Sequence, residues 1–126
     1  MPTKLVLLCD RNAKPLGDAN MKEIESLLEQ AEAAGISCQR LDTKDMDETE
    51  LKEWRNKAFG VATRFKQRIR QAFGSQSQGM LPYFGKEVPA LFVYEEGEAE
   101  PVAVYPHRKA KERRSIEGYL RQMLES

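Results

Sequence analysis

The chain has 126 residues, of which 40% are hydrophobic and 32% charged, and its 20 basic residues balance its 20 acidic ones. This size suits a single domain, residues 1–126, with one core, and zero net charge excludes a whole-molecule field that would draw the protein to nucleic acid or membrane. Every apolar run is shorter than the roughly 18 residues of a membrane span. The run Leu5–Leu8 is also shorter than the roughly 7–15 apolar residues of a signal peptide, so we expect a cytoplasmic protein.

The first third of the sequence predicts a strand, a helix and a second strand. Lys4–Cys9 is nearly continuously apolar, which is typical of a strand buried on both faces. Asn20 and Glu23 form a capping-box pattern, and Gly35 is a natural helix stop. Ile36–Leu41 follows as a short second strand, parallel to the first. The helix between them is indicated by apolar residues at helical spacing: Met21, Ile24, Leu27, Leu28 and Ala31.

A long second helix is predicted to end at Gly74. Asp47 and Glu50 offer a second capping box, and Gly60 in mid-helix indicates a bend or a close contact, because glycine costs about 1 kcal/mol there relative to alanine. One apolar stripe runs along this helix, formed by Leu51, Trp54, Ala58, Val61, Ala62, Phe65, Ile69 and Phe73.

The segment after this helix predicts a β-hairpin. The apolar runs Ala90–Tyr94 and Pro101–Tyr105 are separated by a polar turn around Gly97. Pro89 has no N–H to donate, so it belongs just before its strand. A last helix is indicated by Ile116, Tyr119, Leu120, Met123 and Leu124. The order β-α-β-α-β-β-α predicts an α/β fold, with a four-stranded mixed sheet and helices on both faces.

The hairpin resembles the thioredoxin-like superfamily. Tyr83, Val88-Pro89-Ala90 and the Gly97-Glu98 turn fall at the family's offsets, and the element order is that of a thioredoxin-like fold without its optional first strand. The resemblance implies that Pro89 is cis and that Val88 offers its backbone to an extended partner chain, near Tyr83 and Phe84. The family's Cys-x-x-Cys is missing, because residues 11–18 contain no cysteine; disulfide exchange is therefore not expected.

A second resemblance is to the thioredoxin-like proteins of integrating conjugative elements. It rests on Trp54, Gly60 and Arg64 in the long helix, and on Val88-Pro89-Ala90 and Val104-Tyr105 in and before the hairpin. This resemblance implies a mobile-element protein. The corresponding alternative function is association with nucleic acid through basic helix faces.

Two cysteines, Cys9 and Cys38, are too far apart in sequence for a metal-binding or redox pair motif. Cys9 beside Arg11 could be a single reactive thiol, but a small hydrophobic residue in a buried strand is the expected reading, and the same holds for Cys38. Neighbouring parallel strands could bring the two sulfur atoms within bonding distance, whereas a reducing compartment opposes a disulfide. With one histidine and no cysteine pair, we expect no metal site and no cofactor.

His107 lies among basic residues and is expected at the surface, at a strand end; a catalytic role would need a carboxylate, for which Glu112 is the local candidate.

A basic patch for phosphate or nucleic acid could form, but solvated helix faces balanced by acidic stretches are the expected reading. That patch would contain Arg64, Arg68, Arg108, Lys109 and Arg113.

The sequence therefore predicts a thioredoxin-like protein without redox chemistry, which binds a protein or peptide partner near Val88-Pro89. The alternative enzyme is a monothiol oxidoreductase or transferase that uses Cys9. The long amphipathic helix could also mediate homodimerisation.

Overall fold

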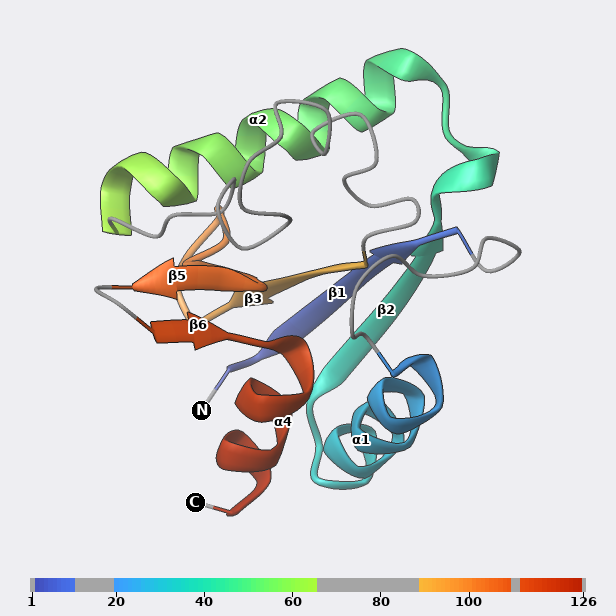
Figure 1. Ribbon diagram of the computed structural model, residues 1–126, viewed down its shortest axis with the longest axis vertical. Coiled ribbons are helices and arrows are strands. Elements are labelled where there is room, and N and C mark those ends of the chain that lie inside the picture. Colours follow the sequence, from blue (N-terminus) through green and yellow to red (C-terminus); the bar gives the residue numbers. More distant parts are fainter. Residues whose placement is uncertain (1, 11–19, 66–88, 110–111, 126) are drawn as a thin grey trace.

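The computed structural model describes residues 2–10, 20–65, 89–109 and 112–125 and has a mixed α/β fold (Figure 1). The strands are β1 (Lys4–Cys9), β2 (Ser37–Asp42), β3 (Ala90–Tyr94), β4 (Ala103–Tyr105), β5 (His107–Lys109) and β6 (Glu112–Arg114). The α-helices are α1 (Met21–Ala33), α2 (Glu48–Phe65) and α4 (Ile116–Glu125), and a short 3-10 helix, η1 (Thr43–Asp45), precedes α2.

Four strands form one mixed sheet in the order β2-β1-β3-β4. β1 and β2 are parallel, with Leu5 opposite Cys38, while β3 runs antiparallel to β1 and to β4. The predicted second strand and the predicted hairpin are both confirmed, although β4 begins at Ala103 rather than at Pro101. The central strands β1 and β3 are almost wholly buried, as their continuous apolar sequences predict.

Helices cover both faces of this sheet, so that β1 contributes to two apolar clusters. α1 and α4 lie together on one face and α2 lies across the other (Figure 1). Because side chains alternate along a strand, Leu5, Leu7 and Cys9 pack towards α1 and α4, whereas Val6 and Leu8 pack towards α2.

Local sequence signals fix the ends of several elements. The Asn20 side chain accepts a hydrogen bond from the Glu23 amide, and Asp47 accepts one from the Glu50 amide, as N-capping residues do. Gly35 and Gly97 have positive φ angles of 94° and 81°, which suits glycine at a helix end and at a hairpin turn. The Glu23 carboxylate pairs with Arg121 of α4 and thereby ties the two helices together.

One feature of the chain differs from the sequence expectation. The short hairpin of β5 and β6, in which Arg108 pairs with Arg113, was not predicted. A Cβ built on Gly60 meets no described atom within 4 Å, so the described residues show no close contact there. The predicted end of the long helix at Gly74 lies outside the described residues.

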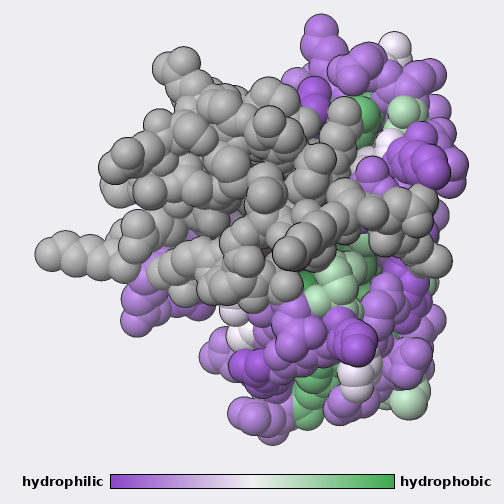
Figure 2. Space-filling view, turned by 45° about the vertical axis from the view of Figure 1, so that its right-hand side comes forward, coloured by the Kyte–Doolittle hydropathy of each residue, from purple (hydrophilic) through white to green (hydrophobic). Residues whose placement is uncertain are grey.

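On the face shown in Figure 2, the described residues are mostly hydrophilic, with apolar residues visible only in narrow areas. Among the described residues, no helix is both long enough and apolar enough to cross a membrane.

Candidate functional site

The end of β1 and the start of β3 lie side by side in the sheet. Leu8 is opposite Ala90, so continuing this antiparallel register brings Pro89 next to Cys9. Pro89 is buried and stands immediately before the strand, where its missing N–H disturbs no ladder hydrogen bond. The other residues expected at this site, Tyr83, Phe84 and Val88, lie outside the described residues, and so does the Val88–Pro89 peptide bond.

Cys9 is buried in the strand rather than presented to solvent. Its side chain is 4% exposed and belongs to the apolar cluster under α1 and α4. This position matches a small hydrophobic residue in a core strand. A substrate could reach the sulfur atom only after local opening of the fold.

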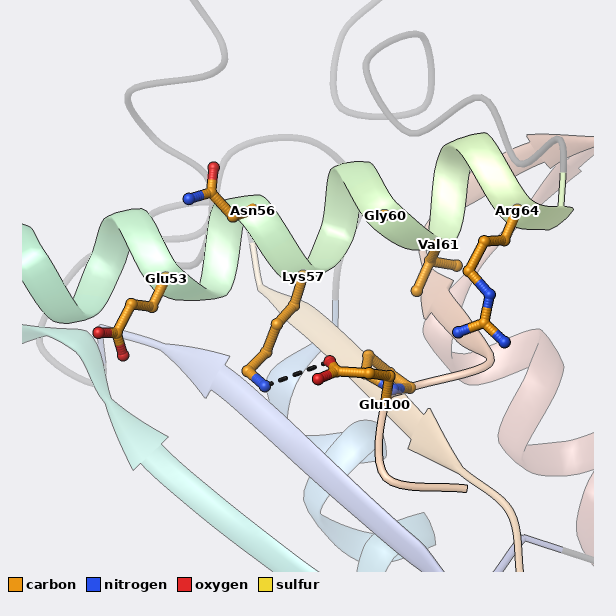
Figure 3. A pocket seen from close by; sticks show the side chains of 8 residues that line it. Glu53, Asn56, Lys57, Gly60, Val61, Arg64 and Glu100 are labelled. Carbon is orange, nitrogen blue, oxygen red and sulfur yellow. Dashed lines mark hydrogen bonds and ion pairs between the residues drawn. The ribbon is translucent and has the colours of Figure 1, made fainter. Parts of the chain in front are cut away.

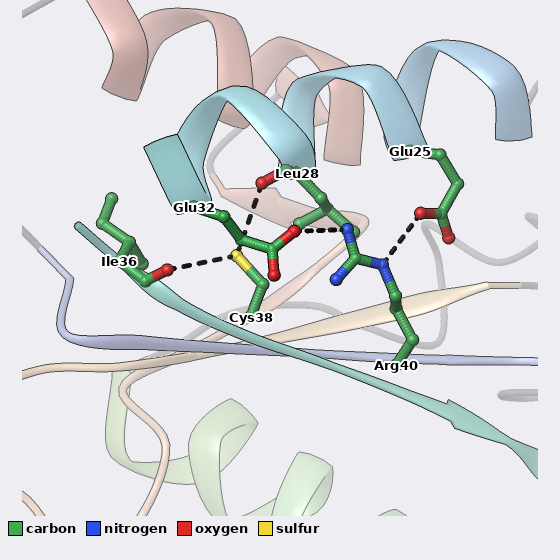
Figure 4. Close-up of polar contacts among 6 residues, drawn as sticks. All are labelled: Glu25, Leu28, Glu32, Ile36, Cys38 and Arg40. Atoms are coloured by element: carbon green, nitrogen blue, oxygen red, sulfur yellow. Dashed lines mark hydrogen bonds and ion pairs between the residues drawn. The ribbon is translucent and has the colours of Figure 1, made fainter. Parts of the chain in front are cut away.

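Cys38 lies between β2 and α1, with its Sγ 3.7 Å from the backbone oxygens of both Leu28 and Ile36 (Figure 4). Burial raises the pKa of this thiol, and the nearby carboxylates raise it further. Cys9 lies opposite Asp42, whereas Cys38 lies opposite Leu5, which separates the two cysteines by about 13 Å along the strands. This distance excludes a disulfide between them, and neither cysteine is disulfide-bonded.

Arg40 fastens the outer strand β2 to helix α1 (Figure 4). Its Nε donates to Glu25 and its Nη2 donates to Glu32, both at 2.8 Å. The hydrogen bond from Arg40 lowers the pKa of Glu32 below its ordinary value of 4.5, and the same bond raises the pKa of Arg40. Because Arg40 belongs to β2 and both carboxylates belong to α1, we assign this cluster the structural role of linking the strand to the helix.

Replacing Arg40 by methionine should lower the free energy of unfolding by about 1 kcal/mol at pH 7, the upper end for a partly exposed ion pair. Because the folded-state pKa of Glu32 is lowered, the stabilisation is complete above about pH 5 and declines as the pH falls through the folded-state value. Urea unfolding between pH 7 and pH 3 measures this, with the exposed Lys22→Met in α1 as the control. A wild-type advantage that stays constant down to pH 3 would contradict the assignment.

His107 was expected at the surface, and this expectation is wrong. Its side chain is 2% exposed, its Nδ1 lies 2.7 Å from the Val104 carbonyl oxygen, and its ring packs on Tyr105 with centroids 4.6 Å apart. In the β5–β6 ladder it is Lys109, not His107, that lies opposite Glu112. The hydrogen bond satisfies a buried polar group, which suits a structural histidine.

Among the five residues of the expected basic patch, only Arg64 has a described side chain. Arg64 is exposed at the end of α2, with its guanidinium carbon 5.0 Å from the centre of the Phe65 ring. Arg68 lies outside the described residues. Arg108, Lys109 and Arg113 are placed by their backbone in β5 and β6, and their side chains are outside the description. The patch therefore stays a prediction.

A hollow of about 430 Å³ lies between α2 and the segment that leads into β4 (Figure 3). Lys57 crosses it to reach Glu100, with 3.4 Å between Nζ and the carboxylate, and also lies 5.7 Å from the centre of the Trp54 ring. Trp54 itself packs edge-on against Phe92, as its expected core role requires. The hollow is lined by Glu53, Asn56, Lys57, Gly60, Val61, Arg64, Glu100 and Pro101.

A second recess, of about 330 Å³, lies beside β4 and the start of α4. Tyr105 and Tyr119 stack within it, with ring centroids 4.3 Å apart. Burial raises the pKa of both phenols, so they stay protonated at neutral pH. Sequence patterns did not reveal either recess. The first joins α2 to Glu100 and Pro101, which are far along the chain, and the second forms only when β4, β6 and α4 fold against one another.

Comparison with known proteins gives no relative from which a role could be transferred. The chain matches no protein-family model, and no curated protein or solved structure is significantly similar to it.

Proposed function

We propose that this protein is a thioredoxin-like binding protein without redox chemistry, which recognises an extended partner chain at the loop that leads into β3, around Val88-Pro89. The observation that carries the proposal is the position of Pro89. It immediately precedes a buried central strand, and the sheet register aligns it with the end of β1. In the resemblance, the residue before this proline presents its backbone to a bound chain.

The arrangement of the sheet supports the same proposal. The four strands form one mixed sheet in which β1 is parallel to β2 and antiparallel to β3, which is compatible with the element order on which the resemblance rests. Helices cover both faces of the sheet, as predicted, with α1 and α4 on one face and α2 on the other.

The two cysteines argue for binding rather than for thiol chemistry. Cys9 is 4% exposed and lies far from Cys38 along the strands, so these residues supply neither an accessible nucleophile nor a resolving partner. Under the proposal, binding uses backbone hydrogen bonds from Val88 and apolar contact beside Pro89, as in other complexes where an extended chain meets an exposed backbone. The proposal assigns the protein to the cytoplasm, where both cysteines would remain thiols.

The proposal predicts that peptides selected from a random library on the full chain bind at this end of the sheet. Addition of a selected peptide to ¹⁵N-labelled protein should shift the amide signals of Cys9, Asp10 and Ala90. Calorimetry should show binding weakened about tenfold or more in Pro89→Ala, since the altered loop backbone no longer presents its groups to the peptide.

Pro101→Ala is the matched control, because Pro101 is also a buried proline that precedes a strand. This variant should bind the selected peptides as the wild type does. Circular dichroism establishes that both variants are folded. If no peptide is selected, or if the shifted amides lie in α1 and α4 instead, the proposed site is wrong.

A further inference from the structure

The outward side of α2 carries an exposed aromatic ring. Leu51, Ala58 and Val61 point to the core, and Phe59, which follows Ala58, is 42% exposed. Among the described residues, Phe59 is the large hydrophobic residue that is exposed to solvent. Single exposed apolar residues are common, so this ring becomes informative only together with the charges around it.

Two residues of opposite charge lie on the outward side of α2, on the flank away from Phe59. Glu53 and Arg64 are both exposed and stand at opposite ends of the hollow, with Lys57 and its partner Glu100 between them (Figure 3). Eleven residues of helix place their Cα atoms about 16 Å apart. Asn56 lies on the helix between this charged flank and Phe59, because residues three or four apart share a face.

Gly60 leaves the centre of the outward side of α2 without a projecting side chain. It is exposed, and a Cβ built on it would meet no described atom within 4 Å, so the packing of the described residues does not require glycine. Glycine is a poor helix-interior residue, but it permits close approach of another backbone. The surface therefore combines a protruding ring, a flat centre and, at the two ends of the hollow, the opposite charges of Glu53 and Arg64.

We propose that α2 is the interface of a symmetric dimer, in which the two copies of the helix lie antiparallel across a twofold axis near Phe59. In such an isologous contact, a residue before the axis meets the residue equally far after it in the other copy. Phe59 then meets Phe59 of the second copy. Glu53 lies six residues before Phe59 and Arg64 five residues after it, so the two charges face each other across the axis, twice per dimer.

This register favours a second copy of the chain, rather than a different protein, as the partner of the α2 surface. The one-residue offset between the charge pair and the aromatic pair corresponds to about 1.5 Å along the helix, which long Glu and Arg side chains span. The twofold axis also keeps both Phe59 rings on one flank and both charge pairs on the other. An unlike partner would have to supply all three complementary groups independently.

Sedimentation of the full chain tests the dimer by charge reversal. The wild type should show a concentration-dependent monomer–dimer equilibrium. Glu53→Arg and Arg64→Glu should each raise the dissociation constant at least about tenfold, because each places like charges opposite one another twice. Phe59→Ser should weaken the dimer by a similar factor, through loss of a central aromatic contact.

Mixing the two charge-reversal variants gives the sharpest outcome. In a mixed dimer of Glu53→Arg with Arg64→Glu, both facing pairs are attractive again, so dimerisation should return to within about threefold of the wild type. Glu29→Arg, on the exposed side of α1, is the control and should leave the equilibrium unchanged. The proposal is overturned by a wild type that stays monomeric up to hundreds of micromolar, by dimers indifferent to either reversal, or by a mixture that does not recover.

Discussion

Replacing Phe92 by alanine should lower the free energy of unfolding by about 3–5 kcal/mol, the usual cost of removing a fully buried phenylalanine side chain. Phe92 is completely buried in the central strand β3 and meets the edge of Trp54 at a centroid distance of 4.9 Å. The substitution removes the largest side chain among the fully buried residues on the face that α2 covers. Since small domains are stable by only about 5–15 kcal/mol, a large part of the stability should be lost.

Denaturant unfolding measures this effect, and Phe59→Ala is the matched control. Phe59 is 42% exposed on the outer side of α2, so the same change of residue should alter the stability by no more than about 0.5 kcal/mol. The comparison should be made at a protein concentration low enough that self-association contributes nothing. Equal losses in the two variants would show that α2 does not pack on β3 as described.

The thiol of Cys9 should react with a thiol reagent at least about 100-fold more slowly in the folded protein than in the unfolded chain, because the reagent must wait for local opening of the core. The measurement uses Cys38→Ala, in which Cys9 is the only cysteine left. Cys9 is 4% exposed and packs under α1 and α4. This protection separates a structural cysteine from the nucleophile that a monothiol oxidoreductase or transferase would need.

Cys38, studied in Cys9→Ala, supplies the comparison within the same fold. It is only partly buried, so its protection should be smaller. Since burial and nearby carboxylates raise the pKa of its thiol, its labelling rate should keep rising with pH beyond the ordinary thiol range. A Cys9 that reacts at pH 7 as fast as a small free thiol would restore the enzyme hypothesis.

The sequence by itself determined the elements whose signals are local. The unbroken apolar run of β1 predicted a central strand, Asn20 and Asp47 predicted two helix starts, and Gly97 predicted the turn between β3 and β4. Capping, glycine turns and burial on both faces of a strand depend on residues within a few positions of one another. These patterns can therefore be recognised before any tertiary contact is known.

Only the tertiary structure decided the burial of His107, the Arg40 link and the hollow beside α2. β5 and β6 have three residues each, which is too short for a periodic pattern, and His107 is covered by contacts such as that with Tyr105. Lys57 and Glu100 meet although 43 residues separate them. Such contacts are set by how helices pack on the sheet, and no local pattern in the sequence encodes that packing.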